Sequence, residues 1–234
     1  VSSCLSMIRL LLFSLLLSLA AQAKETVVLL HGLARSAKSM EKMEQALAKE
    51  GYQVLNLNYP SRKQSIHELS DFVSEKVAPH AARASKVHFV THSMGGIIVR
   101  HLQKNQPVKN LGRVVMLSPP NKGSEVVDKI GCYKLVKWVN GPAGGELGTG
   151  EKATPLVLGP VNFELGIITG DRSINWINSS MIPGKDDGKV SVESAKVEGM
   201  KAFQVVHATH PMIMKKKKVI ADVVTFLKEG RFQK

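Results

Sequence analysis

The chain has 234 residues and a formal net charge of +13 at pH 7, and hydrophobic residues make up 44% of it. These values fit one globular domain with a sizeable core and exclude a largely disordered protein. The positive charge favours contact with anionic surfaces such as lipid headgroups, lipopolysaccharide or nucleic acid, without choosing among them. No zinc-ligand spacing, recognition helix or interleaved aromatic run supports nucleic-acid binding, so we expect none.

Residues 1–23 differ in character from the rest of the chain. An apolar block, Leu10–Ala20, follows Arg9 and precedes a small-residue Ala-Gln-Ala segment, the layout of a secretory signal that is cleaved after Ala23. The block is shorter than the about 20 residues of a membrane span. We therefore expect a bacterial protein that is exported to the periplasm or secreted, with an uncleaved amino-terminal anchor as the alternative. Cys132 would remain as the single cysteine of the mature chain, which excludes an internal disulfide.

Strand-like and helix-like segments alternate through residues 24–234. Short, mostly apolar runs predict strands over 26–30, 52–57, 87–90, 113–118, 163–169 and 203–206. Apolar residues at helical spacing and helix-start signals predict helices from 36 or 39 to about 50, and over 65–77, 94–103, 125–139, 191–197 and 215–228. This alternation indicates an α/β domain of about six mainly parallel strands with helices on both faces. Sites in such sheets lie at the carboxyl ends of the strands.

Between residues 119 and 160 the regular alternation stops. The stretch Gly141–Gly150, G-P-A-G-G-E-L-G-T-G, is typical of a loop or a small cap over a site rather than of a core element. It has no phosphate-loop signature, because no Lys-Ser or Lys-Thr follows at the required spacing.

A serine sits at the sharpest predicted turn of the chain. Ser93 lies between the strand 87–90 and the helix 94–103, in the string T-H-S-M-G. A strand that turns into a helix at a serine exposes the hydroxyl at the end of the sheet, and small neighbours let the two backbones approach. The amide of Met94, at the start of the helix, would then face an oxyanion formed on an acyl group attached to Ser93.

A serine hydroxyl needs a base, and the base needs a carboxylate that fixes its tautomer. Both follow in the chain, at the ends of successive strands. Asp187 comes after the fifth predicted strand, with Asp186 and Asp171 as rivals, and His210 comes after the sixth, with His207 as its rival. We expect these residues to converge with the serine.

The first strand is followed by His31-Gly32-Leu33, a turn that can aim the Leu33 amide as a second oxyanion donor. We assign His31, Gly32 and His92 to the substrate-binding surroundings, although His31 also fits a buried residue that steadies this loop. His92 lines the site or packs, because its side chain starts on the wrong side of the turn. His207 and His210 have metal-ligand spacing but lack partner cysteines or carboxylates nearby, so we expect no metal.

These motifs, in this order, resemble the α/β-hydrolase superfamily, and in particular small bacterial lipase-like serine esterases of the triacylglycerol lipase and acetyltransferase/hydrolase type. The resemblance rests on strand-H-G-L, T-H-S-M-G-G, S-P-P-N-K-G-S, D-D-G-K-V-S-V-E-S-A and H-P-M-I-M. It implies Ser93 as nucleophile, Asp187 as acid, His210 as base and no metal or organic cofactor. Thr91, where the pattern usually has glycine, raises the question of how the turn packs.

The expected function is cleavage of carboxylic esters through an acyl-enzyme on Ser93, with a small-molecule or lipid ester as substrate. One rival is an acyltransferase or thioesterase with the same three residues. Another is a catalytically silent hydrolase fold that binds lipid or the cell envelope. Contact with an anionic membrane surface is compatible with each of them, and the oligomeric state is left open.

Overall fold

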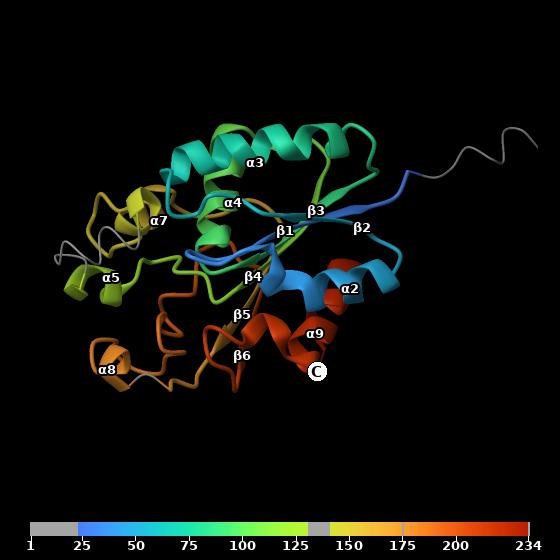
Figure 1. The fold of residues 1–234 in the computed structure, drawn as a ribbon. Coiled ribbons are helices and arrows are strands. Elements are labelled where there is room, and N and C mark those ends of the chain that lie inside the picture. Colours follow the sequence, from blue (N-terminus) through green and yellow to red (C-terminus); the bar gives the residue numbers. More distant parts are fainter. Residues whose placement is uncertain (1–22, 131–140, 175, 234) are drawn as a thin grey trace, which may run out of the picture.

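The computed structural model describes residues 23–130, 141–174 and 176–233, and the predicted signal segment lies almost entirely outside them. Six parallel strands form one sheet in the order β2-β1-β3-β4-β5-β6 (Figure 1). They are β1 (Thr26–Leu30), β2 (Gln53–Leu57), β3 (Val87–His92), β4 (Leu111–Leu117), β5 (Leu165–Gly170) and β6 (Ala202–Val206). The predicted α/β-hydrolase architecture is confirmed, with strand bounds shifted by at most two residues.

Helices cover both faces of this sheet. Figure 1 shows α3 and α4 on one face and α2 and α9 on the other, whereas α5, α7 and α8 lie beyond the carboxyl ends of the strands. The bounds are η1 (Ala37–Met40), α2 (Glu41–Lys49), α3 (Ile66–Ala81), α4 (Met94–Asn105), α5 (Glu125–Ile130), α7 (Thr154–Val157), α8 (Trp176–Ser179), η2 (Ile213–Lys215) and α9 (Lys217–Glu229).

The central strands are apolar on both sides because both faces of the sheet are covered. Val28 and Leu30 of β1 pack into the core under α3 and α4, whereas Val27 and Leu29 pack into the core under α2 and α9. All four side chains are fully buried. This two-sided burial fixes the ends of β1 and β3, from which the candidate site is built.

The glycine-rich stretch 141–150, predicted to be a loop or a small cap and not a core element, contributes side chains to the core. Residues 141–145 are helical, and Ala143 and Leu147 belong to the core under α3 and α4. The carboxylate of Glu146 accepts the amide of Ile66 at the start of α3, which ties the segment to the domain. The predicted helix over 125–139 is described only as α5, because residues 131–140 lie outside the described residues.

Arg100 of α4 binds residues at both ends of the region 119–160. Its guanidinium is buried and donates to the backbone oxygens of Asn121, Pro155 and Gly159. Burial lowers its pKa to about 10. Four carbonyl and amide oxygens thus replace water around a charge that would otherwise be costly to bury.

The predicted helix over 191–197 is wrong, since these residues form a bridge and turns. The Ser191 hydroxyl accepts the amide of Ser194, and the Asn121 side chain donates to the carbonyl of Ala195. The Ser194 amide and the Ala195 carbonyl are thus bonded to side chains, whereas in a helix over 191–197 they would bond to other backbone groups. Among the described residues, no helix is long and apolar enough to cross a bilayer.

Candidate active site

Ser93 lies at the strained corner between β3 and α4. Its backbone has φ 54° and ψ −124°, a region that residues other than glycine seldom occupy. Its amide donates to the carbonyl of Leu117 over 2.8 Å, which holds the corner against β4. The strain presents a half-buried hydroxyl beyond the carboxyl end of the sheet.

Close backbone approach around this corner requires glycine. A Cβ atom at Gly95 would lie 2.9 Å from the carbonyl oxygen of Leu30, and one at Gly32 would lie 2.8 Å from Nδ1 of His92. At Thr91 the backbone of β3 pairs with Leu30 of β1 and Met116 of β4, and the threonine side chain is fully buried. Threonine in place of glycine is therefore accommodated at this position.

The structure brings Ser93, His210 and Asp187 into one hydrogen-bonded line. Nε2 of His210 lies 3.0 Å from Oγ of Ser93, and Nδ1 lies 2.8 Å from Oδ2 of Asp187. A carboxylate can only accept, so Nδ1 carries the proton and Nε2 is free to accept the serine hydroxyl. The three residues come from the loops after β3, β6 and β5, the carboxyl ends predicted from the sequence.

Asp187 is held as a carboxylate although it is only 1% exposed. Burial raises the pKa of its carboxyl, but the charge and hydrogen bond of His210 and the amide of Val190 outweigh burial and hold it below the ordinary value. Oδ1 accepts the amides of Lys189 and Val190 over 3.1 and 2.9 Å. The His210 amide donates to the Asp187 carbonyl over 2.9 Å, so the two residues are also linked through their backbones.

The rival residues are engaged elsewhere. Asp186 accepts the Ser179 hydroxyl and the Gly188 amide. Asp171 and His207 pair with each other over 3.1 Å, and the side chain of His207 is 73% exposed. The two rivals therefore form a separate surface pair.

His31 stabilises the turn after β1 from inside. Its ring is fully buried and stacks on Tyr59 at a centroid distance of 4.0 Å. Nδ1 donates to the Gly32 carbonyl over 2.8 Å, which leaves Nε2 to accept the Tyr59 amide. Burial lowers the pKa of His31 and keeps the ring neutral. Both nitrogens are engaged within the protein, and through them His31 ties the loop after β1 to Tyr59.

His92 supports the loop that carries His210. Its Nε2 donates to the His210 carbonyl over 3.0 Å, and the two rings lie 4.8 Å apart. Burial, then the nearby charge of His210, lowers the pKa of His92 well below its ordinary value. The sequence places His92 near the site, but it carries no signal for this supporting contact or for the stacking of Tyr59 on His31.

The predicted oxyanion donors are the amides of Leu33, in the loop after β1, and Met94, the residue after the serine. Met94 opens α4, where the first amides of a helix have no acceptor within the helix. Leu33 lies in the turn that the Arg35 amide closes by donating to the Gly32 carbonyl. Among the described residues, no three His, Cys, Asp or Glu side chains are grouped to hold a metal ion.

The amino-terminal part of the chain, which carries Ser93, matches a known protein family. A family model described as serine aminopeptidase, S33, matches residues 21–157, which is more than half of the chain. The chain belongs to this S33 family of α/β-hydrolases. The S33 match includes Leu33, Ser93 and Met94, whereas Asp187 and His210 lie beyond it and rest on the geometry above.

A curated relative and several solved structures resemble this S33 hydrolase. The lysosomal thioesterase PPT2-B of Xenopus laevis is 32% identical over 126 residues, 49% of this chain, and the chain spans only 43% of that relative. The mature lipase BlEst2 of Bacillus licheniformis aligns with TM-score 0.65, 18% identity, and coverage of 90% of this chain and 93% of that one. Lipase B of Aspergillus fumigatus aligns with TM-score 0.67, 15% identity, and coverage of 92% and 54%. At these identities the structural matches show the fold.

Proposed function

We propose that the protein is a serine hydrolase that cleaves carboxylic esters through an acyl-enzyme on Ser93. The observation that carries this proposal is the line from Ser93 Oγ through His210 to Asp187, with 3.0 and 2.8 Å between the bonded atoms. Membership of a hydrolase family supports it, as do the lipases with the same fold.

In the first half of the reaction, Ser93 Oγ attacks the carbonyl carbon of the ester while Nε2 of His210 takes the hydroxyl proton. The carbonyl oxygen becomes an oxyanion that the amides of Leu33 and Met94 stabilise. When the tetrahedral intermediate collapses, the C–O bond to the alcohol breaks and His210 returns the proton to that alcohol. The acyl group is then attached to Ser93.

In the second half, His210 removes a proton from water as the water attacks the acyl carbon. Collapse of this second intermediate releases the carboxylic acid and returns the proton to Ser93. Asp187 stays ionised throughout, and it holds the ring in the tautomer that leaves Nε2 free. An alcohol in place of water would give acyl transfer, so the accepting molecule separates the hydrolase from the acyltransferase.

A thioester substrate is the second candidate, because the curated relative is named a thioesterase. The two activities use the same residues and differ in the leaving group. A pair of substrates with one acyl chain and either an oxygen or a sulfur leaving group separates them directly.

The test compares three chains that begin at Lys24: the unaltered sequence, Ser93→Ala and Ser85→Ala. Ser85→Ala is the control, because Ser85 is exposed and precedes β3, at the end of the strand opposite Ser93. Each is treated with a fluorophosphonate probe and assayed on p-nitrophenyl esters of increasing chain length and on matched thioesters. We expect labelling and turnover in the unaltered and control chains and neither in Ser93→Ala. A folded, unaltered chain that neither labels nor turns over would leave the lipid- or envelope-binding module as the better explanation.

We also propose that residues 1–23 direct export and are removed, which leaves the domain over 24–234. The support is the sequence layout described above. Expression with the native amino terminus, followed by fractionation and mass measurement, is expected to give a periplasmic or secreted chain that starts at Lys24. A membrane-bound chain of full mass would favour the uncleaved anchor.

A further inference from the structure

Residues of α2 and α9 line a basic groove. These two helices lie on the face of the sheet opposite α3 (Figure 1). Its volume is about 600 Å³. Ala46, Ile220 and Val224 also line the groove and are half-buried. Ile220 and Val224 pack against the core of this face, so these apolar side chains form the floor of the groove. Lysines from both helices and from η2 line the groove, namely Lys42, Lys49, Lys215 and Lys217. The sequence shows a run of lysines only at 215–218; the fold adds two more from α2.

Acidic side chains do not neutralise this groove. Glu50 is the one acidic residue that lines it, and Glu50 is engaged with Lys228 over 2.5 Å. Within the described residues, none of the four lining lysines takes part in an ion pair. Nearby Asp222 is buried and pairs with Lys218 instead. The groove therefore offers four uncompensated ammonium groups around an apolar floor.

We propose that this groove docks the protein on a bilayer surface that contains anionic lipids. Lipid phosphates fit the lysines, and the upper methylenes of a lipid fit the apolar floor. A nucleic-acid backbone would match the charge but leave the apolar floor without a partner, because single-stranded recognition relies on aromatic platforms. Each lysine near an anionic bilayer strengthens binding roughly fivefold.

The groove also adjoins the loop that carries His210. This loop leads through the exposed Met212 into η2, and the ammonium of Lys216 donates to the carbonyl of His207. If the protein docks through α2 and α9, the loop that carries His210 lies at the edge of its contact with the bilayer. This consequence rests on the proposed esterase function, whereas the docking itself does not.

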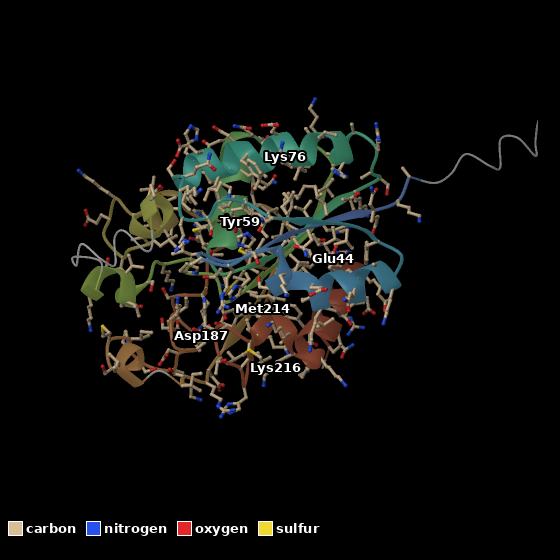
Figure 2. The ribbon with its side chains drawn as sticks, in the orientation of Figure 1. Glu44, Tyr59, Lys76, Asp187, Met214 and Lys216 are labelled. Carbon is tan, nitrogen blue, oxygen red and sulfur yellow. The ribbon has the colours of Figure 1, made fainter. Side chains whose placement is uncertain are left out.

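The test measures sedimentation with vesicles of phosphatidylcholine alone and of phosphatidylcholine with phosphatidylglycerol. All proteins carry Ser93→Ala, so no lipid is cleaved, and begin at Lys24, which retains every described strand and both cores. The groove variant is Lys42→Gln with Lys217→Gln. The matched control is Lys76→Gln with Lys109→Gln, which removes the same charge; Figure 2 shows Lys76 on α3, opposite the side that carries Glu44 and Lys216.

We expect preference for the anionic vesicles, a roughly 30-fold weaker partition for the groove variant, and a change of less than about threefold for the control. Equal losses in the two variants would show that net charge alone drives binding and would overturn the groove. Equal sedimentation with neutral and anionic vesicles would also overturn it, because the lysines would then play no part in binding. No sedimentation with either vesicle would overturn bilayer docking and make an acidic protein the better partner. Because the background lacks the serine, a failure here is distinct from a failure of the esterase proposal.

Discussion

Each end of the sheet holds a buried histidine beside a carboxylate, but the two histidines differ in what their second nitrogen contacts. At the carboxyl ends, Nδ1 of His210 faces Asp187 over 2.8 Å while Nε2 faces the Ser93 hydroxyl over 3.0 Å. The hydroxyl sits on backbone with positive φ and is half-buried. This histidine can therefore pass a proton to and from a reacting group.

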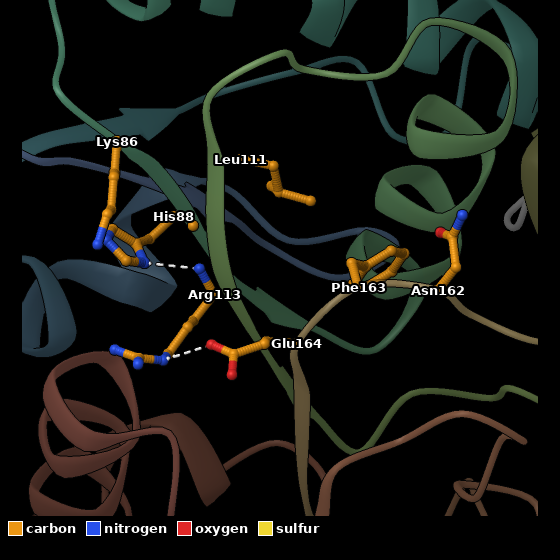
Figure 3. A pocket seen from close by; sticks show the side chains of 8 residues that line it. Lys86, His88, Leu111, Arg113, Asn162, Phe163 and Glu164 are labelled. Atoms are coloured by element: carbon orange, nitrogen blue, oxygen red, sulfur yellow. Dashed lines mark hydrogen bonds and ion pairs between the residues drawn. The ribbon is translucent and has the colours of Figure 1, made fainter.

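At the amino ends, His88 has no reactive neighbour. Its Nε2 lies 3.3 Å from a Glu25 carboxylate oxygen. Its Nδ1 accepts the Arg113 amide over 2.8 Å (Figure 3). Arg113 in turn binds Glu164 over 2.7 Å beside a cavity of about 390 Å³. Burial lowers the pKa of His88 despite the nearby Glu25. A histidine–carboxylate pair thus becomes a candidate base only where its other nitrogen faces a group that can react.

The largest expected effect separates the two histidines by activity. His210→Gln removes the proposed base, and we expect kcat for a p-nitrophenyl ester to fall roughly 10⁶-fold, as loss of a triad histidine does elsewhere. His88→Gln keeps the activity of the folded enzyme within a fewfold range. Both are measured on chains whose folding is verified by circular dichroism. A similar loss in both would mean that the amino-end pair is not merely structural.

The two carboxylates provide the next contrast. Asp187→Asn replaces the acceptor of the His210 proton with an amide that favours the wrong tautomer, and we expect kcat to fall about 10⁴-fold. Glu25→Gln leaves kcat nearly unchanged. Steady-state assays on both variants test this. Full activity in Asp187→Asn would return Asp186 to consideration as the acid.

Much of this site could be predicted from the sequence because its residues follow strands. The order Ser93, Asp187, His210 and the parallel sheet together predict convergence at one edge, and the geometry brings these three together. The rivals Asp171 and His207 follow strands as well. Only the side-chain geometry separates them, because their mutual pairing depends on loop conformations that have no pattern in the sequence.

Contacts between distant segments could not be predicted. Tyr59 stacks on His31, and Arg100 binds the carbonyls of Pro155 and Gly159, across many intervening residues. No periodicity or motif in the sequence indicates these roles of Tyr59 and Arg100, because each role depends on the partner that the fold brings close. The false helix over 191–197 has the same origin, since Asn121 reaches in from another loop and takes a backbone carbonyl.

Acid is expected to destabilise both ends of the sheet. His31, His88 and His92 all have a pKa lowered by burial, so below pH 6.5 the unfolded chain binds protons that the folded chain does not. The free energy of unfolding therefore falls as the pH is lowered below 6.5, by at most about 1.4 kcal/mol per pH unit for each histidine and about 4 kcal/mol per pH unit for all three. Urea denaturation at pH 7.5, 6.5 and 5.5 measures the slope.

The variant His88→Gln isolates the contribution of His88, at the amino ends of the strands, to the slope of the free energy of unfolding against pH. It lowers the slope by up to about 1.4 kcal/mol per pH unit and leaves the contributions of His31 and His92 in place. An unchanged slope would show that His88 titrates freely in the folded chain. Comparison with the parent at pH 7.5, where all three rings are neutral in both states, controls for the loss of packing.

One glycine at each end of the sheet is expected to separate effects on stability from effects on catalysis. A Cβ atom at Gly112 would lie 2.5 Å from the buried His88 ring, so Gly112→Ala costs about 1 to 3 kcal/mol of stability and spares kcat/KM. At Gly95 the Cβ would meet the Leu30 carbonyl at 2.9 Å, but alanine also favours helix α4 by up to about 1 kcal/mol, which offsets part of the strain. The remaining strain moves the end of β1, and with it the Leu33 amide, relative to Ser93. We therefore expect Gly95→Ala to lower kcat/KM more than Gly112→Ala does, and Gly112→Ala to lower the free energy of unfolding more than Gly95→Ala does. Ester hydrolysis and urea denaturation on the same samples measure the two quantities. Equal activity losses in the two folded variants would show that the amino-end cluster shapes the active site after all.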